Sequence, residues 1–554
     1  MQAASTPRPH NAASTWVPVA VFLAAVVTFI LVFRAYLGAV WIPLADSASN
    51  DMLVLEAKQL ALLHGNYSRV GFYHPGPHLF YLMAAGEFLF HDLLGVAKST
   101  EAAQQLAVIC LSIVILQIVE RVYRDLAGDL AISLCATAAT ALSVVLMVPE
   151  AFTSMSVPYT YVTAGLLFFV GGAALIAGHF RWLWVFVLGG AMLVSGHASY
   201  LGLVPMMGVV LVGAIAAFQP QTRSLAGVRA LAAEHRGSVI ASAVILAILL
   251  LPIILYVVLH FPGEYPKYLE FAGRQPRKGW IAVAYVLLPY WRFAGAAAIV
   301  FLTCFLTAPA RASAKDGWRG IAVAAVGVFV AGTGAVVFYI QKGVDIIADN
   351  SLYLVWWYQA APATCVGLAV VCVGTLATRR RPFFAMLVVL LCAGVWFTRW
   401  PVPNGNDMAN VEKTMAVLEQ KSRASGRPVR LALDVKPSLF VDVWARAIAL
   451  IAEQERRGER IACIEEYNWQ LSYHERNRCP PANPNEVQIR YVASYDDLAP
   501  IGGSLVGTFV GLRLYDIKPA NWPRDRILGP WVGLSEDAAN AARGGMADPD
   551  KAVR

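Results

Sequence analysis

Residues 41–95 read WIPLADSASNDMLVLEAKQLALLHGNYSRVGFYHPGPHLFYLMAAGEFLFHDLLG. They follow an apolar run at 16–38 that is long enough to cross a bilayer, which takes roughly 20 residues. The stretch is too polar to be a continuous span and too long to be a simple turn. It predicts an amphipathic helix at 52–64 that ends at Gly65. A second apolar helix at 79–90 is too short to span, and we expect it to lie at the membrane surface or to re-enter the membrane.

The composition agrees with a membrane protein. The chain has 554 residues, of which 58% are hydrophobic and 14% are charged, and its mean hydropathy is +0.56. A soluble domain carries about 25% charged residues, so a large soluble fold is excluded. The net charge of +8 does not indicate nucleic-acid binding, because the basic residues lie in short clusters between apolar runs. We predict a mostly α-helical, polytopic transmembrane bundle with a small C-terminal α/β domain.

Apolar runs predict about eleven spans. They lie at 16–38, 102–119, 129–148, 158–178, 182–197, 199–218, 238–260, 293–309, 320–339, 353–376 and 382–398. The first lacks a small-residue cleavage site after it, so we interpret it as a retained helix and not a signal peptide. Basic residues gather in alternate connections, which predicts a bacterial inner-membrane protein with a cytoplasmic N-terminus. One predicted outer loop, 261–292, is also basic and breaks this rule.

These spans divide the chain into three parts. Residues 1–400 form the transmembrane domain, with a first periplasmic loop at 41–100, and 401–530 form a periplasmic α/β domain. Residues 531–554 are expected to be a flexible tail. Within the α/β domain the pattern predicts a helix at 440–457 and strands at 429–435, 460–464, 487–492 and 505–517.

The cysteines give one further expectation. Six of the eight lie in apolar runs, where we expect inert packing residues. Cys463 and Cys479 lie in the predicted periplasmic domain, where an oxidising environment would let them pair; two free thiols are the alternative.

Carboxylates at the membrane boundary are the strongest functional signal. Asp51 and Glu56 follow the first span directly, and ionisable groups at a membrane boundary are costly unless they serve a function. The alternative is structural, since Asp51 precedes an apolar helix and could cap it.

The order of features around these acids identifies a resemblance. Asn50-Asp51, Gly65-Asn66-Tyr67 and His74-Pro75 follow the first span in turn, and the second span ends in ERVYRDLAGD at 120–129. This arrangement resembles the family C glycosyltransferases, in particular protein O-mannosyltransferases and the aminoarabinose transferases that modify lipid A. The resemblance covers the first 200 residues or so. Asn50 departs from the acidic pair of that family, and His74 from its usual Lys or Pro.

The resemblance implies that a sugar moves from a polyprenyl-phosphate carrier to an acceptor hydroxyl on a glycan, lipid or protein, with inversion at the anomeric carbon. Such a step needs a base at the hydroxyl and positive charge at the leaving phosphate. Asp51 is the first candidate base and Glu56 the second. The position that best matches a further family acid is Ser156, so the nearby Glu150 is a third candidate, with a solvated loop residue as the alternative.

Basic and aromatic residues supply the candidate binding groups. For the donor phosphate these are Lys267, Arg274, Arg277, Lys278, Arg292 and Lys342, with contacts to lipid headgroups as the alternative. For the substrate they are His74, His78, His197, Tyr353 and Trp357, with an interfacial aromatic belt or satisfied polar residues as the alternative.

No cofactor is expected. A divalent metal on His74 and His78 is disfavoured because Pro75 and Pro77 oppose a helix that would place both on one face. The expected partners are the lipid-linked sugar, membrane lipid and the acceptor, and no nucleic acid. Two other functions remain open: a transporter or flippase of lipid-linked sugars, and a non-catalytic assembly protein of the cell envelope.

Overall fold

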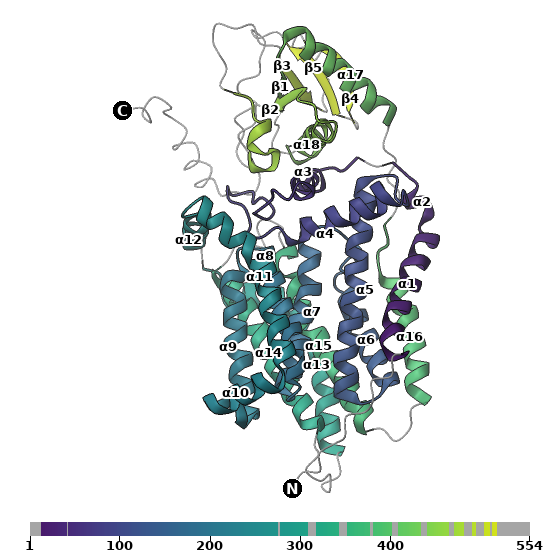
Figure 1. The fold of residues 1–554 in the computed structure, drawn as a ribbon, viewed down its shortest axis with the longest axis vertical. Coiled ribbons are helices and arrows are strands. Elements are labelled where there is room, and N and C mark those ends of the chain that lie inside the picture. Colours follow the sequence, from purple (N-terminus) through teal and green to yellow (C-terminus); the bar gives the residue numbers. More distant parts are fainter. Residues whose placement is uncertain are drawn as a thin grey trace.

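A computed structural model shows a bundle of long helices with a small α/β domain at one end (Figure 1). It describes residues 13–40, 42–274, 277–307, 317–342, 352–376, 381–401, 408–433, 440–464, 470–480, 490–494, 503–509 and 512–517. The predicted tail at 531–554 lies outside these residues.

Each predicted span overlaps an apolar helix. Among the described residues, seven helical segments are long and apolar enough to cross a membrane: α5 (Thr100–Ala127), α7 (Val157–Ile176), α9 (Tyr200–Phe218), α11 (Arg236–Leu259), α13 (Trp280–Thr307), α14 (Gly317–Lys342) and the pair η4 (Leu352–Gln359) with α15 (Ala360–Leu376). Four further apolar helices are shorter over the residues whose side chains the structure describes: α1 (Ala13–Val32), counted over Val19–Val32, α6 (Leu130–Val145), α8 (Leu183–Gly196), which follows the 3-10 turn η2 (Phe180–Trp182), and α16 (Arg381–Phe397), counted over Ala385–Phe397. The chain is therefore a multi-pass membrane protein.

The predicted loop at 261–292 is wrong in its second half. It contains the short helix α12 (Tyr265–Arg274), but α13 already begins at Trp280 and runs through Pro289 and Arg292. The apolar residues before Pro289 continue the helix, and membrane helices tolerate an internal proline. At the opposite end of the bundle from the α/β domain, η3 (Pro220–Arg223) and α10 (Leu225–Glu234) connect α9 to α11 (Figure 1).

The first loop, residues 42–99, is an ordered structure that lies between the bundle and the α/β domain (Figure 1). After α2 (Arg34–Leu37) it forms α3 (Asp46–Lys58), α4 (His78–Glu87) and a π-helical turn, η1 (Phe88–Leu93). The predicted helix at 52–64 is displaced, because Leu60 adopts the left-handed φ of 58° just after the helix ends. Gly65 instead packs against backbone: a Cβ there would lie 2.8 Å from the Gly76 carbonyl oxygen.

Helix α3 belongs to two hydrophobic cores. Its Leu53, Val54 and Ala57 are buried among residues of the transmembrane bundle. Ala48 and Met52, one turn apart on another face, are buried in the core of the α/β domain. The first loop is thus the layer on which the C-terminal domain rests.

The C-terminal domain contains a five-stranded sheet in the order β2-β1-β3-β5-β4. Its strands are β1 (Val429–Leu433), β2 (Ala462–Ile464), β3 (Arg490–Ser494), β4 (Gly503–Phe509) and β5 (Leu512–Ile517), and its helical elements are α17 (Met408–Ser425), α18 (Phe440–Arg456), η5 (Gln470–Tyr473) and η6 (Glu475–Asn477). Strands β2, β1 and β3 are parallel, while β5 pairs antiparallel with both β3 and β4. The single strand predicted at 505–517 is a hairpin. Cys463 and Cys479 form the expected disulfide.

Replacing Met52 by alanine is expected to loosen the junction between the first loop and the C-terminal domain. Met52 is fully buried, and truncating such a side chain costs about 2–5 kcal/mol. Thermal unfolding of the purified protein measures this loss. Leu60→Ala is the matched control, because the Leu60 side chain is 79% exposed and its truncation should leave the unfolding temperature nearly unchanged. Equal effects of the two substitutions would contradict the shared core.

Candidate active site

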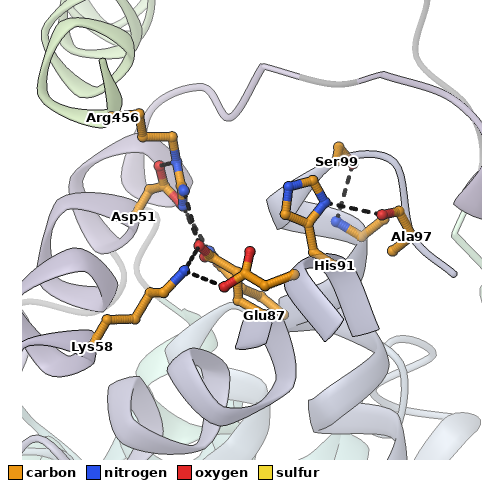
Figure 2. A network of polar contacts seen from close by, with 10 residues as sticks. Asp51, Lys58, Glu87, His91, Ala97, Ser99 and Arg456 are labelled. Carbon is orange, nitrogen blue, oxygen red and sulfur yellow. Dashed lines mark hydrogen bonds and ion pairs between the residues drawn. The ribbon is translucent and has the colours of Figure 1, made fainter. Parts of the chain in front are cut away.

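Arg456, the last residue of α18, reaches from the C-terminal domain into the first loop and lies between Asp51 and Glu87 (Figure 2). Both carboxylate oxygens of Asp51 accept hydrogen bonds from its guanidinium, through Nε and Nη2. Glu87 accepts two more, at 3.0 Å from Nη1 and 2.9 Å from Nη2. One guanidinium therefore binds all four oxygens of two carboxylates that come from different helices.

Three further side chains complete this Arg456 cluster, which we define as Asp51, Lys58, Glu87, Asp92, Gln104 and Arg456. The Gln104 amide on α5 donates to Asp51 Oδ1 at 2.8 Å and to Glu87 Oε2 at 2.9 Å. Lys58 Nζ lies 2.8 Å from Glu87 Oε1 and 2.7 Å from Asp92 Oδ2 (Figure 2). The cluster thus joins α3, α4, η1, α5 and α18.

The two carboxylates at the centre of the cluster are buried, while Lys58 and Asp92 at its edge are partly exposed. Asp51 and Glu87 are each 1% exposed. Burial raises the pKa of Glu87, but the hydrogen bonds and charge of Arg456, with hydrogen bonds from Lys58 and Gln104, outweigh burial and lower that pKa to about 2. Burial lowers the pKa of Arg456, but Asp51 and Glu87 raise it further, so the guanidinium stays charged. Buried charges persist in proteins when they are paired in this way.

The other two predicted bases are also paired. Glu56 lies 3.2 Å from His474 Nδ1 and 3.3 Å from Arg476 Nη1, both in the C-terminal domain. Burial raises its pKa, but these two partners together with His64 lower it overall. Glu150 lies 3.3 Å from Arg399 Nη1 and is partly exposed. Each of the three predicted bases therefore contacts an arginine, and their roles in proton transfer remain predictions. Asp51 lies inside α3, so the alternative that it caps this helix is wrong.

The three predicted histidines form a second group, which we call the histidine cluster. The rings of His74 and His197 stack with their centroids 4.1 Å apart. His78 Nδ1 lies 2.9 Å from Ser195 Oγ, and the Gly76 amide donates to the Ser195 carbonyl at 2.7 Å. The first loop and the α8–α9 connection, which are distant in sequence, are joined here.

Burial makes these histidines neutral hydrogen-bond donors. It lowers the pKa of His78 and of His197 to about 4, and with the charge of His197 it lowers the pKa of His74 well below its usual range. The Nδ1 atom of His74 accepts from the Ala198 amide at 3.4 Å, and that of His197 from the Ser199 amide at 3.2 Å. His197 Nδ1 also lies 2.9 Å from Ser199 Oγ. The two amide contacts favour the tautomer that carries the hydrogen on Nε2 in both rings.

The predicted phosphate-binding residues lie on several elements. Lys267 is in α12, where it pairs with Glu264 Oε2 at 2.9 Å, and Arg274 is the last residue of that helix. Arg277 and Lys278 lie between α12 and α13, and Lys342 ends α14. Arg292 is wrongly assigned to the loop: it lies within α13, with its guanidinium 4.8 Å from the ring centroid of Phe293.

Helix α12 is attached to the first loop. The Tyr268 hydroxyl donates to the Tyr73 carbonyl, and the Phe72 ring packs edge-on against the rings of Tyr268 and Phe271. A small pocket at this contact is lined by His74, Pro75, Ile253, Tyr256, Val257, Glu264, Tyr265 and Tyr268. The basic residues that flank α12 therefore lie on the same side of the bundle as the histidine cluster.

Trp357 is not part of an exposed aromatic belt. It is 1% exposed, and its ring packs edge-on against Tyr200 at 5.8 Å. Tyr200 contacts Tyr161, which contacts His197, so an aromatic row leads from the histidine cluster to Trp357. Tyr353 is half-buried at the start of the same segment. Their proposed contacts with substrate remain predictions.

Glu87, Lys58, Gln104 and Arg456 were missed from the sequence. Glu87 carried a usable signal, since it is an acid within an otherwise apolar helix. Arg456 carried none, because its position at the end of an amphipathic helix is typical of solvated arginines. In the described part of the chain, no group of three or more His, Cys, Asp or Glu side chains is placed to hold a metal ion.

Comparison with known proteins gives matches among solved structures only. No protein family and no curated protein matches the chain. The chain resembles ArnT from Cupriavidus metallidurans. The apo structure of that protein is 12% identical to this chain, with a TM-score of 0.41, and the match covers 91% of this chain and 98% of that chain. The structure bound to undecaprenyl phosphate is also 12% identical, with a TM-score of 0.43, and the match covers 92% of this chain and 99% of that chain. Such low values transfer no residue role or ligand, so we base the function on this chain's own residues.

Lowering the pH is expected to weaken the Arg456 cluster. The pKa of Glu87 falls from its ordinary value of 4.5 to about 2 on folding, so ionised Glu87 stabilises the folded protein above pH ~4.5. This stabilisation, about 3 kcal/mol at 1.36 kcal/mol per pKa unit, is lost as the pH falls toward 2. Thermal unfolding of wild type and Glu87→Gln between about pH 3 and 7 should give the largest difference above about pH 5. A difference that does not change with pH would contradict this assignment.

Proposed function

We propose that the protein is a membrane glycosyltransferase that moves a sugar from a polyprenyl-phosphate carrier to a hydroxyl of a glycan, lipid or protein by a single inverting displacement. One observation supports this proposal most directly. The first loop, which carries the sequence resemblance, is an ordered layer at one end of the bundle, and it gathers its polar residues into two buried clusters there.

The proposed reaction forms one bond and breaks one. The acceptor oxygen attacks the anomeric carbon while the bond from that carbon to the phosphate oxygen breaks, and polyprenyl phosphate leaves with the bonding electrons. Asp51 is the proposed acceptor of the hydroxyl proton. A carboxylate has about four acceptor positions, and three on Asp51 are filled by Gln104 and Arg456, which leaves one on Oδ2. Because Asp51 is 1% exposed, neighbouring side chains move when the hydroxyl enters.

The histidine cluster supplies the proposed contacts to the donor. In this proposal the Nε2–H groups of His74 and His197 donate hydrogen bonds to phosphate or sugar oxygens of the bound donor and so strengthen its binding. Lys267, Arg277 and Lys278 on and after α12 add positive charge on the same side of the bundle.

We place this end of the protein in the periplasm. The basic residues Arg223, Arg229 and Arg236 flank or lie on α10, at the end of the bundle opposite the C-terminal domain (Figure 1). The positive-inside rule assigns that opposite end to the cytoplasm. A disulfide in the C-terminal domain agrees with an oxidising compartment.

A non-catalytic assembly protein is the second candidate, because every predicted base is bound by an arginine. A flippase is the third, and it would move the lipid-linked sugar without cleaving it. Release of prenyl phosphate separates the first function from both others.

Asp51→Asn is expected to lower transfer by about a hundredfold or more, since loss of a general base removes at least that factor. The assay incubates detergent-purified protein with synthetic short-chain prenyl-phosphate sugars and membrane extract, and it measures free prenyl phosphate. Glu234→Gln, on α10 at the other end of the bundle, is the control and should keep wild-type activity. Activity retained by Asp51→Asn moves the base to Glu56 or Glu150. No release by wild type, with intact donors, refutes the transferase proposal.

His74→Gln and His197→Gln are expected to raise the KM for the donor by roughly fivefold each, because a neutral hydrogen bond contributes about 1 kcal/mol. The KM of wild type should not change between about pH 6 and 8, since both imidazoles are already neutral there. His179→Gln, between α7 and η2, is the control. A wild-type KM that rises steeply with pH would instead indicate a cationic histidine.

A further inference from the structure

We propose that Arg456 is a positioning residue of the catalytic centre: it fixes Asp51 and Glu87 relative to each other and so makes the C-terminal domain a required part of the site. The catalytic half of this inference rests on the proposed glycosyltransferase function. The positional half rests on the contacts of Arg456 alone and is tested without any substrate.

The geometry of the contact is specific to arginine. Nε and Nη2 bind the two oxygens of Asp51, while Nη1 and Nη2 bind the two oxygens of Glu87 (Figure 2). The planar guanidinium presents its donors in a fixed fork, so that one group can bind two carboxylates at once. A lysine ammonium at this position is a single point charge and cannot bind four oxygens at once.

Asp51 depends on this arginine more than Glu87 does. Glu87 has a second cation, Lys58, at 2.8 Å. In the part of the chain that the structure describes, Arg456 is the one cation that contacts Asp51. Without Arg456, the buried carboxylates of Asp51 and Glu87 would lie close together, and Lys58, which pairs with Glu87 and Asp92, would be the remaining cation of the cluster. Repulsion between the two carboxylates would then drive Asp51 and Glu87 apart.

Besides its ion pairs with Asp51 and Glu56, the C-terminal domain is held on α3 by contacts that do not involve charge. Ala48 and Met52 lie in the core of that domain, the Ala45 amide donates to the Ala445 carbonyl at 3.0 Å, and Ser49 Oγ donates to the Ser472 carbonyl at 2.9 Å. These contacts anchor α18 to α3 on both sides of Asp51. They favour a fixed position for Arg456 over a gate that opens and closes by undocking of the domain.

Arg457 provides a matched control. It follows Arg456 at the same helix end, but its guanidinium binds Glu412 and Glu453, each at 2.8 Å, which are both in the C-terminal domain. Replacing Arg457 therefore removes an ion-paired arginine from the C-terminal domain but changes no contact to the first loop.

The experiment compares Arg456→Gln, Arg456→Lys and Arg457→Gln in the full-length protein. Hydrogen exchange of residues 46–58 reports the position of α3, and prenyl-phosphate release is measured against donor concentration and pH. For Arg456→Gln we expect exchange in α3 to become about a hundredfold faster, because loss of one partner of a buried ion pair is strongly destabilising. The kcat should fall by a similar factor, while the donor KM changes by less than about threefold.

The pH profile separates positioning from simple loss of folded protein. Arg456 on α18, Lys58 on α3 and Gln104 on α5 all contact Glu87, and Asp51 shares the guanidinium of Arg456. Glu101 on α5, which interacts electrostatically with Asp51, also acts on this group. Without Arg456 the pKa of Glu87 rises, so the acidic limb of the rate profile should move to higher pH in both Arg456 variants. Arg457→Gln should match wild type in exchange, kcat and pH profile.

Each other outcome is decisive. Unchanged exchange of α3 in Arg456→Gln overturns the proposal. Faster exchange with a wild-type kcat and pH profile shows that Arg456 is structural only, which also overturns it. If wild type releases no prenyl phosphate, the proposed function fails, while the exchange of the Arg456 and Arg457 variants still decides whether Arg456 positions α3. If Arg456→Gln does not fold, Arg456→Lys gives the same comparison with the charge kept.

Discussion

The burial of α3 between two hydrophobic cores is the constraint on which the rest of the structure depends. Leu53, Val54 and Ala57 face the bundle, and Ala48 and Met52 face the C-terminal domain. Because one face of α3 packs on the bundle and another on the C-terminal domain, its charged residues can lie only on the two flanks between these faces. The flank that carries Asp51 is enclosed by α4 and α18, so this buried charge needs a partner.

The acids of α3 and their partners follow from this enclosure. Asp46, Asp51 and Glu56 are five residues apart, so on a helix they point in different directions. Asp46 contacts Arg69 of the first loop at 3.6 Å, Asp51 contacts Arg456, and Glu56 contacts His474 and Arg476. Two of the three partnerships cross to the C-terminal domain. The domain is thereby fixed in orientation as well as in place, since apolar contacts alone would allow it to slide.

The sequence predicts what local patterns determine. Apolar runs located the membrane helices, and alternating residues located β1, β2 and β3, because both signals lie within one element. The ends of α3 were misplaced, since they are set by the contact of Ala45 with Ala445 and by the left-handed Leu60. The role of Arg456 could not be predicted from local sequence, because it contacts Asp51, which lies 405 positions earlier in the chain. The three histidines were recognised one by one, but only the fold shows that they meet.

His74 lies in a place that suits a neutral imidazole better than a lysine. The residue is 8% exposed, stacks on His197 and accepts a hydrogen bond from the Ala198 amide. A lysine ammonium at that place would be buried against another imidazole at a high desolvation cost, and it could not accept a hydrogen bond from the amide. A neutral imidazole satisfies the amide and still offers an Nε2–H group. Burial at this position is therefore compatible with a neutral imidazole and not with a fixed positive charge.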